Sequence, residues 1–204
     1  MPTSPTAEAR IVVAAAPELL GSLTPNAQLD RFREPRQQLQ ALQSIAQDEQ
    51  GTVTALVRGS ELLGYAVFHP PTEIEAWGHD RTGRILELGA IEVAPAERGQ
   101  RWAERLLQAS FADGRFDHTV VFATLYSWHY DLARSGLGDL AYRRMLERLY
   151  RSAGLELFAT TDEEVRSSPA NALMARIGQD APEHVVAEFH RLRGRLPGAP
   201  VAPW

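Results

Sequence analysis

Apolar and polar positions follow two periods along the chain, one typical of strands and the other of helices. Short runs rich in β-branched and apolar residues predict strands at 10–16, 52–58, 62–69, 85–94, 118–125 and 155–160. Apolar residues at helical spacing, with prolines opening some segments, predict helices at 17–23, 36–47, 103–112, 139–152, 169–177 and 183–192. This order of elements indicates a mixed α/β fold in which helices cover a sheet.

The C-terminal third carries the clearest end signals. Gly154 is expected to end the helix 139–152, because glycine is the usual residue just beyond a helix. Ser168 stands directly before Pro169, and Gly178 closes the same segment, so 169–177 is expected to be helical. We therefore expect the sheet to end at the strand 155–160 and to be followed by a helical C-terminal extension.

The amino-acid composition limits the classes of protein to which the chain can belong. A chain of 204 residues with 44% hydrophobic and 23% charged residues can fill one core. We expect a single domain at 10–193, with flexible tails at 1–9 and 194–204. The net charge of −5 argues against nonspecific binding of nucleic acid. The absence of cysteine excludes disulfides, thiolate zinc ligands and a covalent cysteine intermediate.

Nothing in the pattern indicates a membrane or an export signal. No apolar run reaches the roughly 18–20 residues that span a bilayer. The first residues lack the basic and apolar regions of a signal peptide, and the histidines show no metal-ligand spacing. We therefore expect a cytoplasmic protein with no membrane partner and no metal.

The stretch 93–107 carries the most chemical information. A buried strand ends at Val93, Pro95 breaks it, and a loop with one glycine leads into an amphipathic helix. Backbone N–H groups at such a helix start favour an anion, and a diphosphate fits them well. Arg98 and Arg101 would add charge-assisted donors. The same pattern also fits an ordinary strand–helix connection with solvated arginines.

This stretch resembles the acyl-CoA motif of the GNAT acetyltransferases, in which Val-x-Pro is followed by Arg-Gly-x-Gly-x-Gly/Ala and a Leu-Leu helix. The matching positions are Arg98, Gly99, Ala103, Leu106 and Leu107. The resemblance implies the GNAT acyl-CoA N-acyltransferase fold, with acetyl-CoA as co-substrate. The residues that it implies for cofactor binding are Ile91, Val93, Arg98, Gly99, Gln100, Arg101, Trp102 and Ala103. Arg101 departs from the motif, because it stands where the middle glycine is usual. We expect its Cβ to restrict how closely a diphosphate approaches the loop.

A narrower resemblance runs from about residue 36 to residue 192. The stretches that carry it are Glu87–Pro95, Trp128–Leu132, Tyr142-Arg143, Phe158–Thr160 and Pro169–Gly178. In this order they are similar to the acetoin-utilisation acetyltransferase family. The resemblance implies a protein lysine acetyltransferase that modifies the active-site lysine of acetyl-CoA synthetase and inactivates that enzyme.

Direct transfer to a lysine needs a base that removes a proton from the ammonium group. Glu87 and Glu92 lie in an otherwise apolar strand, where an unpaired carboxylate is costly. Residues five apart in a regular strand face opposite sides, whereas a bulge at Gly89-Ala90 would bring both carboxylates to one face. We favour Glu87 as the base, with Glu92 as the second choice and a structural ion pair as the alternative for either.

Three further side chains are candidates for the proton chemistry. His129 follows a strand end and has an unperturbed pKa near working pH, although its aromatic surroundings also fit a core cap. Tyr150 resembles the tyrosine with which many GNAT enzymes protonate the leaving thiolate. Tyr142 lies eight residues earlier, about two helical turns, and so near the same helix face. Either tyrosine also fits a packing role.

Two other functions fit the same residues. One is acetylation of a small amine such as a polyamine, an amino acid or an aminoglycoside. The other is a non-catalytic acyl-CoA sensor, which the arginine in the loop would favour. Turnover with free lysine, spermidine and acetyl-CoA synthetase, measured side by side, discriminates among the three.

Overall fold

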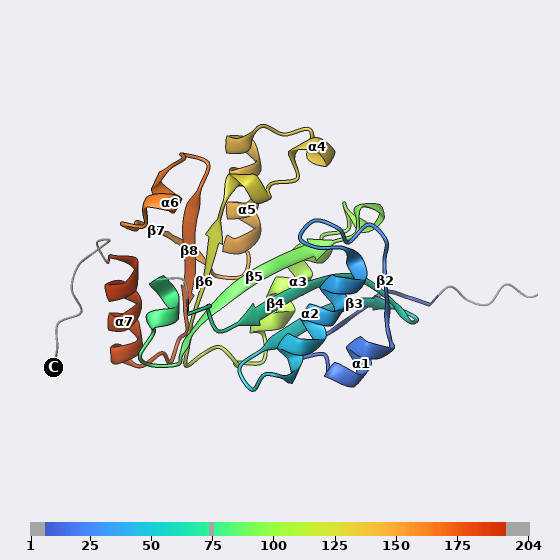
Figure 1. Cartoon of the computed structure of the whole chain (residues 1–204), viewed down its shortest axis with the longest axis horizontal. Helices are drawn as coiled ribbons and strands as arrows, with labels where there is room; N and C mark the ends of the chain where they lie inside the picture. The colour runs from blue at the N-terminus through green and yellow to red at the C-terminus, as the bar shows by residue number, and fades with distance from the viewer. Residues whose placement is uncertain (1–6, 74–75, 195–204) are drawn as a thin grey trace, which may run out of the picture. The chain divides into compact units, whose positions relative to one another are not determined.

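A computed structural model describes residues 7–73 and 76–194 (Figure 1). The chain forms two compact units, one from residues up to His69 with Leu88–Gly114, the other from Pro70–Glu87 with residues from Arg115 onward. Strand β5, Ile85–Val93, begins in the second unit and ends in the first. Most of the expected tails at 1–9 and 194–204 lie outside the described residues.

The first unit is built on the hairpin of β3, Thr52–Arg58, and β4, Glu61–His69. Its strand order is β1-β3-β4-β5, with β2 beside β4. The remaining elements of this unit are β1 (Arg10–Val12), α1 (Pro17–Ser22), β2 (Thr24–Pro25), α2 (Pro35–Gln47), the short 3-10 turn η2 (Pro95–Glu97) and α3 (Trp102–Phe111). The helices predicted at 17–23, 36–47 and 103–112 are therefore confirmed to within one residue at each end.

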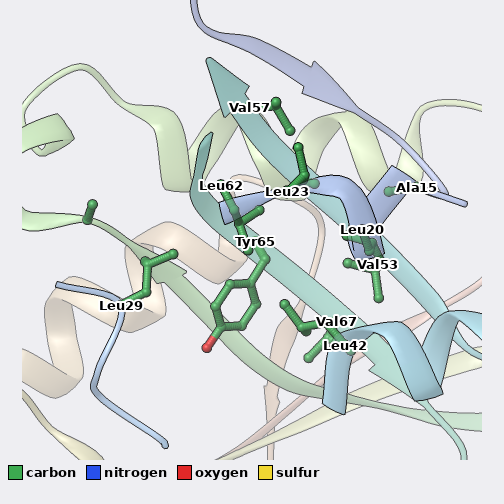
Figure 2. Close-up of a cluster of buried hydrophobic side chains, with 12 residues drawn as sticks. Ala15, Leu20, Leu23, Leu29, Leu42, Val53, Val57, Leu62, Tyr65 and Val67 are labelled. Carbon is green, nitrogen blue, oxygen red and sulfur yellow. The ribbon is translucent and has the colours of Figure 1, made fainter. Parts of the chain in front are cut away.

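Alternation along β3 explains how helices cover both faces of this hairpin. Val53 and Val57 join Leu42 of α2 in one buried cluster (Figure 2). Ala55 belongs to the same cluster. Thr54, which points the other way, accepts a hydrogen bond from Ser110 of α3. The sheet therefore lies between α2 and α3, and both faces are buried.

The second unit has the strand order β5-β6-β8-β7. Its strands are β6 (Val120–Leu125), β7 (Glu156–Phe158) and β8 (Ala172–Ile177), in addition to the start of β5. Its helices and 3-10 turns are η1 (Ala76–His79), η3 (Ser127–His129), α4 (Leu132–Ser135), α5 (Asp139–Arg151), α6 (Glu163–Arg166) and α7 (Glu183–Arg193). The core on the α7 side combines Trp77, Phe122 and Phe189, with Trp77 stacked on both rings.

The helix predicted at 169–177 is wrong, because residues 172–177 form strand β8. β8 pairs antiparallel with β6 on one side and with β7 on the other, so β7 is not the last strand along the chain but the edge strand beside β8. Alanine, leucine and methionine favour helices in isolation, but Ala172–Ala175 are buried in the middle of the sheet, and that burial outweighs local preference. The side chain of Ser168 accepts a hydrogen bond from the N–H of Ala170, as a helix N-cap would, but the residues that follow form a turn and not a helix.

Candidate functional site

The loop between β5 and α3 presents backbone donors at a helix start. Gly99 has a φ of +84°, and a side chain at this position would meet no heavy atom within 4 Å. Helix α3 begins at Trp102, and no side chain caps its first turn. The first N–H groups of a helix have no acceptor inside it, so the loop and helix start suit a phosphate group. Binding of the diphosphate of acetyl-CoA by this loop stays a prediction.

Arg101 occupies the left-handed conformation that explains why glycine is usual at this position. Its φ is 59° and its ψ is 25°. Its guanidinium turns back onto α3, where Nε and Nη2 donate to the Glu104 carboxylate at 2.7 and 2.6 Å. The arginine side chain is therefore fixed on the first turn of the helix, and its effect on cofactor affinity stays a prediction.

An ion pair anchors the same loop to the end of β3. Arg58 donates from Nη1 and Nη2 to the two carboxylate oxygens of Glu97, at 2.7 and 2.8 Å. These hydrogen bonds hold the pKa of the Glu97 carboxyl below its usual range. Gln100 makes a longer contact of 3.4 Å with the same carboxylate. Glu97 is buried, and both of its carboxylate oxygens accept hydrogen bonds from Arg58. This ion pair therefore fixes the position of the residue from which the loop begins.

The remaining residues expected to bind cofactor lie on the same unit. Ile91 and Val93 belong to the second half of β5, Arg98 is exposed, and Ala103 is half-buried in the first turn of α3. Trp102 is buried beneath the guanidinium of Arg105, 3.8 Å from its ring centre. Its Nε1–H is buried without an acceptor among the described residues.

Glu92 is held by two hydrogen bonds inside the first unit. The hydroxyl of Tyr65 donates to Glu92 Oε2 at 2.7 Å, and the backbone N–H of Arg31 donates to Oε1 at 2.9 Å. Figure 2 shows Tyr65 among the apolar side chains, with its phenol oxygen at the edge of the cluster. Glu92 therefore joins β5 and β4 to the segment before α2. Sequence reasoning missed Tyr65, whose signal is a single phenol in an otherwise apolar strand that needs a partner once buried.

Glu87 lies in the first half of β5, in the second unit. It is half-buried and stands in register with Phe122 of the parallel strand β6. Residues in register share a face of the sheet, so the carboxylate lies on the side of Phe122. Burial is the largest cause of the raised pKa of Tyr150, and the charges of Tyr130, Tyr142 and Glu87 raise that pKa further.

The two tyrosine candidates lie on α5 with a third, Tyr130, beside them. Tyr142 stacks on Tyr130 with ring centres 4.7 Å apart, while Tyr150 is buried. Burial raises the pKa of Tyr130 to about 12. A tyrosine with the reference pKa of about 10 is already protonated at neutral pH, and these shifts extend the protonated range to higher pH.

The turn Pro169–Asn171 gathers three of the stretches that carry the family resemblance. The side chain of Asn171 accepts from the N–H of Ser127 at 2.9 Å, and the Tyr130 hydroxyl donates to the carbonyl of Ala170 at 2.6 Å. Arg143 donates to the carbonyl of Pro169. The turn therefore fixes η3 and α5 to the start of β8.

His129 is exposed at the end of η3. Its ring makes edge contacts with Tyr126 and Trp128, and those two rings stack on each other with centres 4.3 Å apart. Trp128 is itself 52% exposed. The exposed part of this aromatic group, Trp128 and His129, thus lies at the surface.

Comparison with known proteins places these features in a family. Residues 18–124, more than half of the chain, match the acetyltransferase (GNAT) family. The chain is 36% identical over 178 residues to the acetoin utilization protein AcuA of Bacillus subtilis, covering 87% of this chain and 85% of that protein. The AcuA protein of Bacillus licheniformis is 35% identical over the same shares. The chain is a GNAT acetyltransferase of the AcuA family.

A solved structure agrees with this assignment. The acetoin utilization protein from Exiguobacterium sibiricum superposes with a TM-score of 0.89 at 38% identity, covering 93% of this chain and 92% of that one. The GNAT fold and the acetyltransferase family predicted from the sequence are thus confirmed.

Neither a membrane-spanning helix nor a metal-ion cluster occurs among the described residues. No helix within 7–73 or 76–194 is both long and apolar enough to cross a bilayer. In the same ranges, no three histidine or acidic side chains gather in a way that could hold a metal ion.

Proposed function

We propose that this GNAT enzyme acetylates a lysine of a protein, and that the protein is acetyl-CoA synthetase, inactivated by modification of its active-site lysine. The observation that carries the proposal is the meeting of three family-specific stretches at the turn Pro169–Asn171, which holds the exposed Trp128 and His129 in place. A rigid, exposed aromatic group suits the surface of a protein better than it suits a small amine. Because acetyl-CoA is used inside cells, the proposal carries a cytoplasmic location.

In the proposed reaction, Glu87 takes one proton from the lysine ammonium, directly or through a water. The neutral amine then attacks the carbonyl carbon of the acetyl thioester, and collapse of the tetrahedral intermediate releases the thiolate of CoA. Transfer yields the acetylated lysine, free CoA and one proton for the solvent. Glu92 is the second candidate for the base, and its two carboxylate oxygens accept hydrogen bonds from Tyr65 and Arg31.

Tyr150 is proposed to protonate the departing thiolate. A phenol is already a weaker acid than a thiol, whose reference pKa is about 8.5, and burial raises the pKa of Tyr150 further. The transfer therefore requires that the reacting nitrogen return a proton to Tyr150 in the same step. Tyr142 and His129 are assigned to positioning the acceptor, since Tyr142 is stacked on Tyr130 and His129 lies at the surface.

The test supplies acetyl-CoA with purified acetyl-CoA synthetase, free lysine or spermidine, and follows thiol release. We expect release with the synthetase, an acetyl group on its active-site lysine by mass spectrometry, and loss of synthetase activity. The matched control is a synthetase with arginine at that lysine, which should give no release. Turnover on lysine or spermidine with none on the synthetase would show a small-molecule enzyme. Binding of CoA in calorimetry without release for any acceptor would show a sensor.

A further inference from the structure

Helix α5 carries an exposed stripe of one leucine and three arginines. Leu140, Arg144, Arg148 and Arg151 are separated by four, four and three residues, so they fall within one face of the helix. All four are exposed. Leu137, two residues before the helix, is exposed as well. We call these five residues the α5 face.

The arginines of the α5 face differ from their neighbour Arg143 in exposure and in ion pairing. Arg143 is half-buried and donates to Glu147 at 2.6 Å. In the part of the chain that the structure describes, Arg144, Arg148 and Arg151 have no carboxylate within ion-pair distance. Like charges three and four residues apart disfavour a helix, and the chain as a whole has a net charge of −5. The stripe therefore gathers positive charge that the fold does not use.

The α5 face also contains exposed apolar side chains. The large apolar side chains that are exposed among the described residues are Trp128, Leu137, Leu140 and Leu157. Two of these four lie within the α5 face, beside the arginines. Arginine together with exposed apolar side chains is the composition of a protein interface, in which the charge selects the partner and the apolar atoms are buried.

We propose that the α5 face docks an acidic surface of the protein substrate. This inference rests on the proposed function and adds the partner chemistry to it. Charge complementarity decides the occupant, because three arginines without acidic partners attract a surface rich in aspartate and glutamate.

The helix that carries this face is held firmly. Arg143 ties it to the carbonyl of Pro169, and its last turn is closed at Gly154, whose φ is +84°. There Gly154 N–H donates to the carbonyl of Arg151 and Leu155 N–H to that of Tyr150, the pattern of a Schellman motif. The backbone that carries the face is therefore already ordered before a partner arrives.

The test compares R144E/R148E/R151E with a matched variant, R10E/R36E/R166E, which reverses three exposed arginines elsewhere. The substrates are acetyl-CoA synthetase and a short peptide that contains its active-site lysine. We expect kcat/KM for the synthetase to fall at least about 10-fold in the first variant and to lose much of its salt dependence. In the first variant, kcat/KM for the peptide and the KM for acetyl-CoA should not change. In the matched variant, kcat/KM for the synthetase should equal that of wild type. R144Q/R148Q/R151Q, which removes the charge without placing acids near a helix C-terminus, guards against a folding defect and should show a smaller loss.

Each other outcome is informative. Equal use of the synthetase by wild type and both glutamine and glutamate variants overturns the docking face and leaves the proposed function standing. A weaker affinity for acetyl-CoA would assign the arginines to the cofactor, and a change of oligomeric state in sedimentation would assign the face to a second copy. Wild-type binding of the synthetase through this face without acetylation would overturn the proposed function and keep the face. Neither binding nor acetylation by wild type overturns both.

Discussion

Tyr65 and Glu92 form a buried pair in which the phenol donates to the carboxylate at 2.7 Å. Burial raises the pKa of Tyr65, and the neighbouring charge of Glu92 raises it further, so the phenol stays protonated and can keep donating. Because Arg31 N–H donates to the other carboxylate oxygen, the pair links the sheet to the segment before α2. Loss of either partner leaves a buried polar group that cannot reach water.

Tyr65→Phe should therefore lower the free energy of unfolding by about 1–3 kcal/mol, the scale for a buried acceptor that loses its donor. Urea denaturation followed by circular dichroism measures this. The control is Tyr142→Phe, at a half-buried position of α5. A loss no greater than that of the control would mean that the bond to Glu92 contributes nothing to stability.

The same pKa shifts predict instability in alkali. The pKa values of Tyr65, Tyr130 and Tyr150 are raised in the folded state, that of Tyr130 to about 12. The stabilisation from each is present in full below the unfolded pKa, near 10, and is lost as the pH rises through the folded value. The free energy of unfolding should thus fall between pH 10 and 12, and tyrosinate absorbance should rise with unfolding. Titration of all five tyrosines near pH 10 while the chain remains folded would contradict the shifts.

Glu87→Gln should reduce kcat by roughly 10²–10⁴, because the amide keeps the shape of the side chain but cannot accept the proton. Acetyl-CoA affinity should stay nearly constant, and higher pH should restore part of the rate as more lysine arrives neutral. Steady-state kinetics from pH 7 to 10 test this. Glu92→Gln and His129→Ala are the controls, and wild-type turnover by Glu87→Gln would remove Glu87 from the chemistry.

Arg101→Gly should be more stable than Arg101→Ala by about 1 kcal/mol. Both variants lose the contact with Glu104, but only glycine adopts the left-handed conformation without a steric cost, which is roughly 1–2 kcal/mol for other residues and is partly offset by the greater freedom of unfolded glycine. Parallel urea titrations give the difference. Equal stability would mean that the loop has another conformation in solution.

Gly178→Ala should destabilise the chain by about 1–3 kcal/mol or more, as overpacking does. A Cβ on Gly178 would lie 2.3 Å from the carbonyl oxygen of Asp117 and 2.5 Å from that of Phe116, both backbone atoms that cannot turn aside. Gly138→Ala is the matched control, since no heavy atom lies within 4 Å of a Cβ there. Similar thermal stability of the two variants would contradict this close approach.

Local patterns were sufficient to predict most elements. The hairpin of β3 and β4 was predicted within one residue because its strands are apolar and a glycine lies between them. The end of α5 at Gly154 was equally predictable, since the left-handed residue of a Schellman motif is commonly glycine. The cofactor loop was found because its motif occupies one continuous stretch of sequence.

The errors and omissions involve contacts between distant segments. Residues 172–177 contain good helix formers, and only their burial between β6 and β7 makes them a strand. Tyr65 and Glu92 are 27 residues apart, and the turn that organises Tyr130 lies 40 residues beyond it. No periodicity links such pairs, so their partnership is visible only in the folded chain.

The place of β8 also sets the order in which the second unit can assemble on a ribosome. β6 and β7 are both synthesised before the strand that joins them, so neither has its shared neighbour when it emerges. Until residues 172–177 follow, β6 has an open edge of the kind that invites pairing with other chains. This unit therefore completes its sheet only after residues 172–177 have been synthesised, and a nascent chain stalled before residue 172 keeps the open edge of β6.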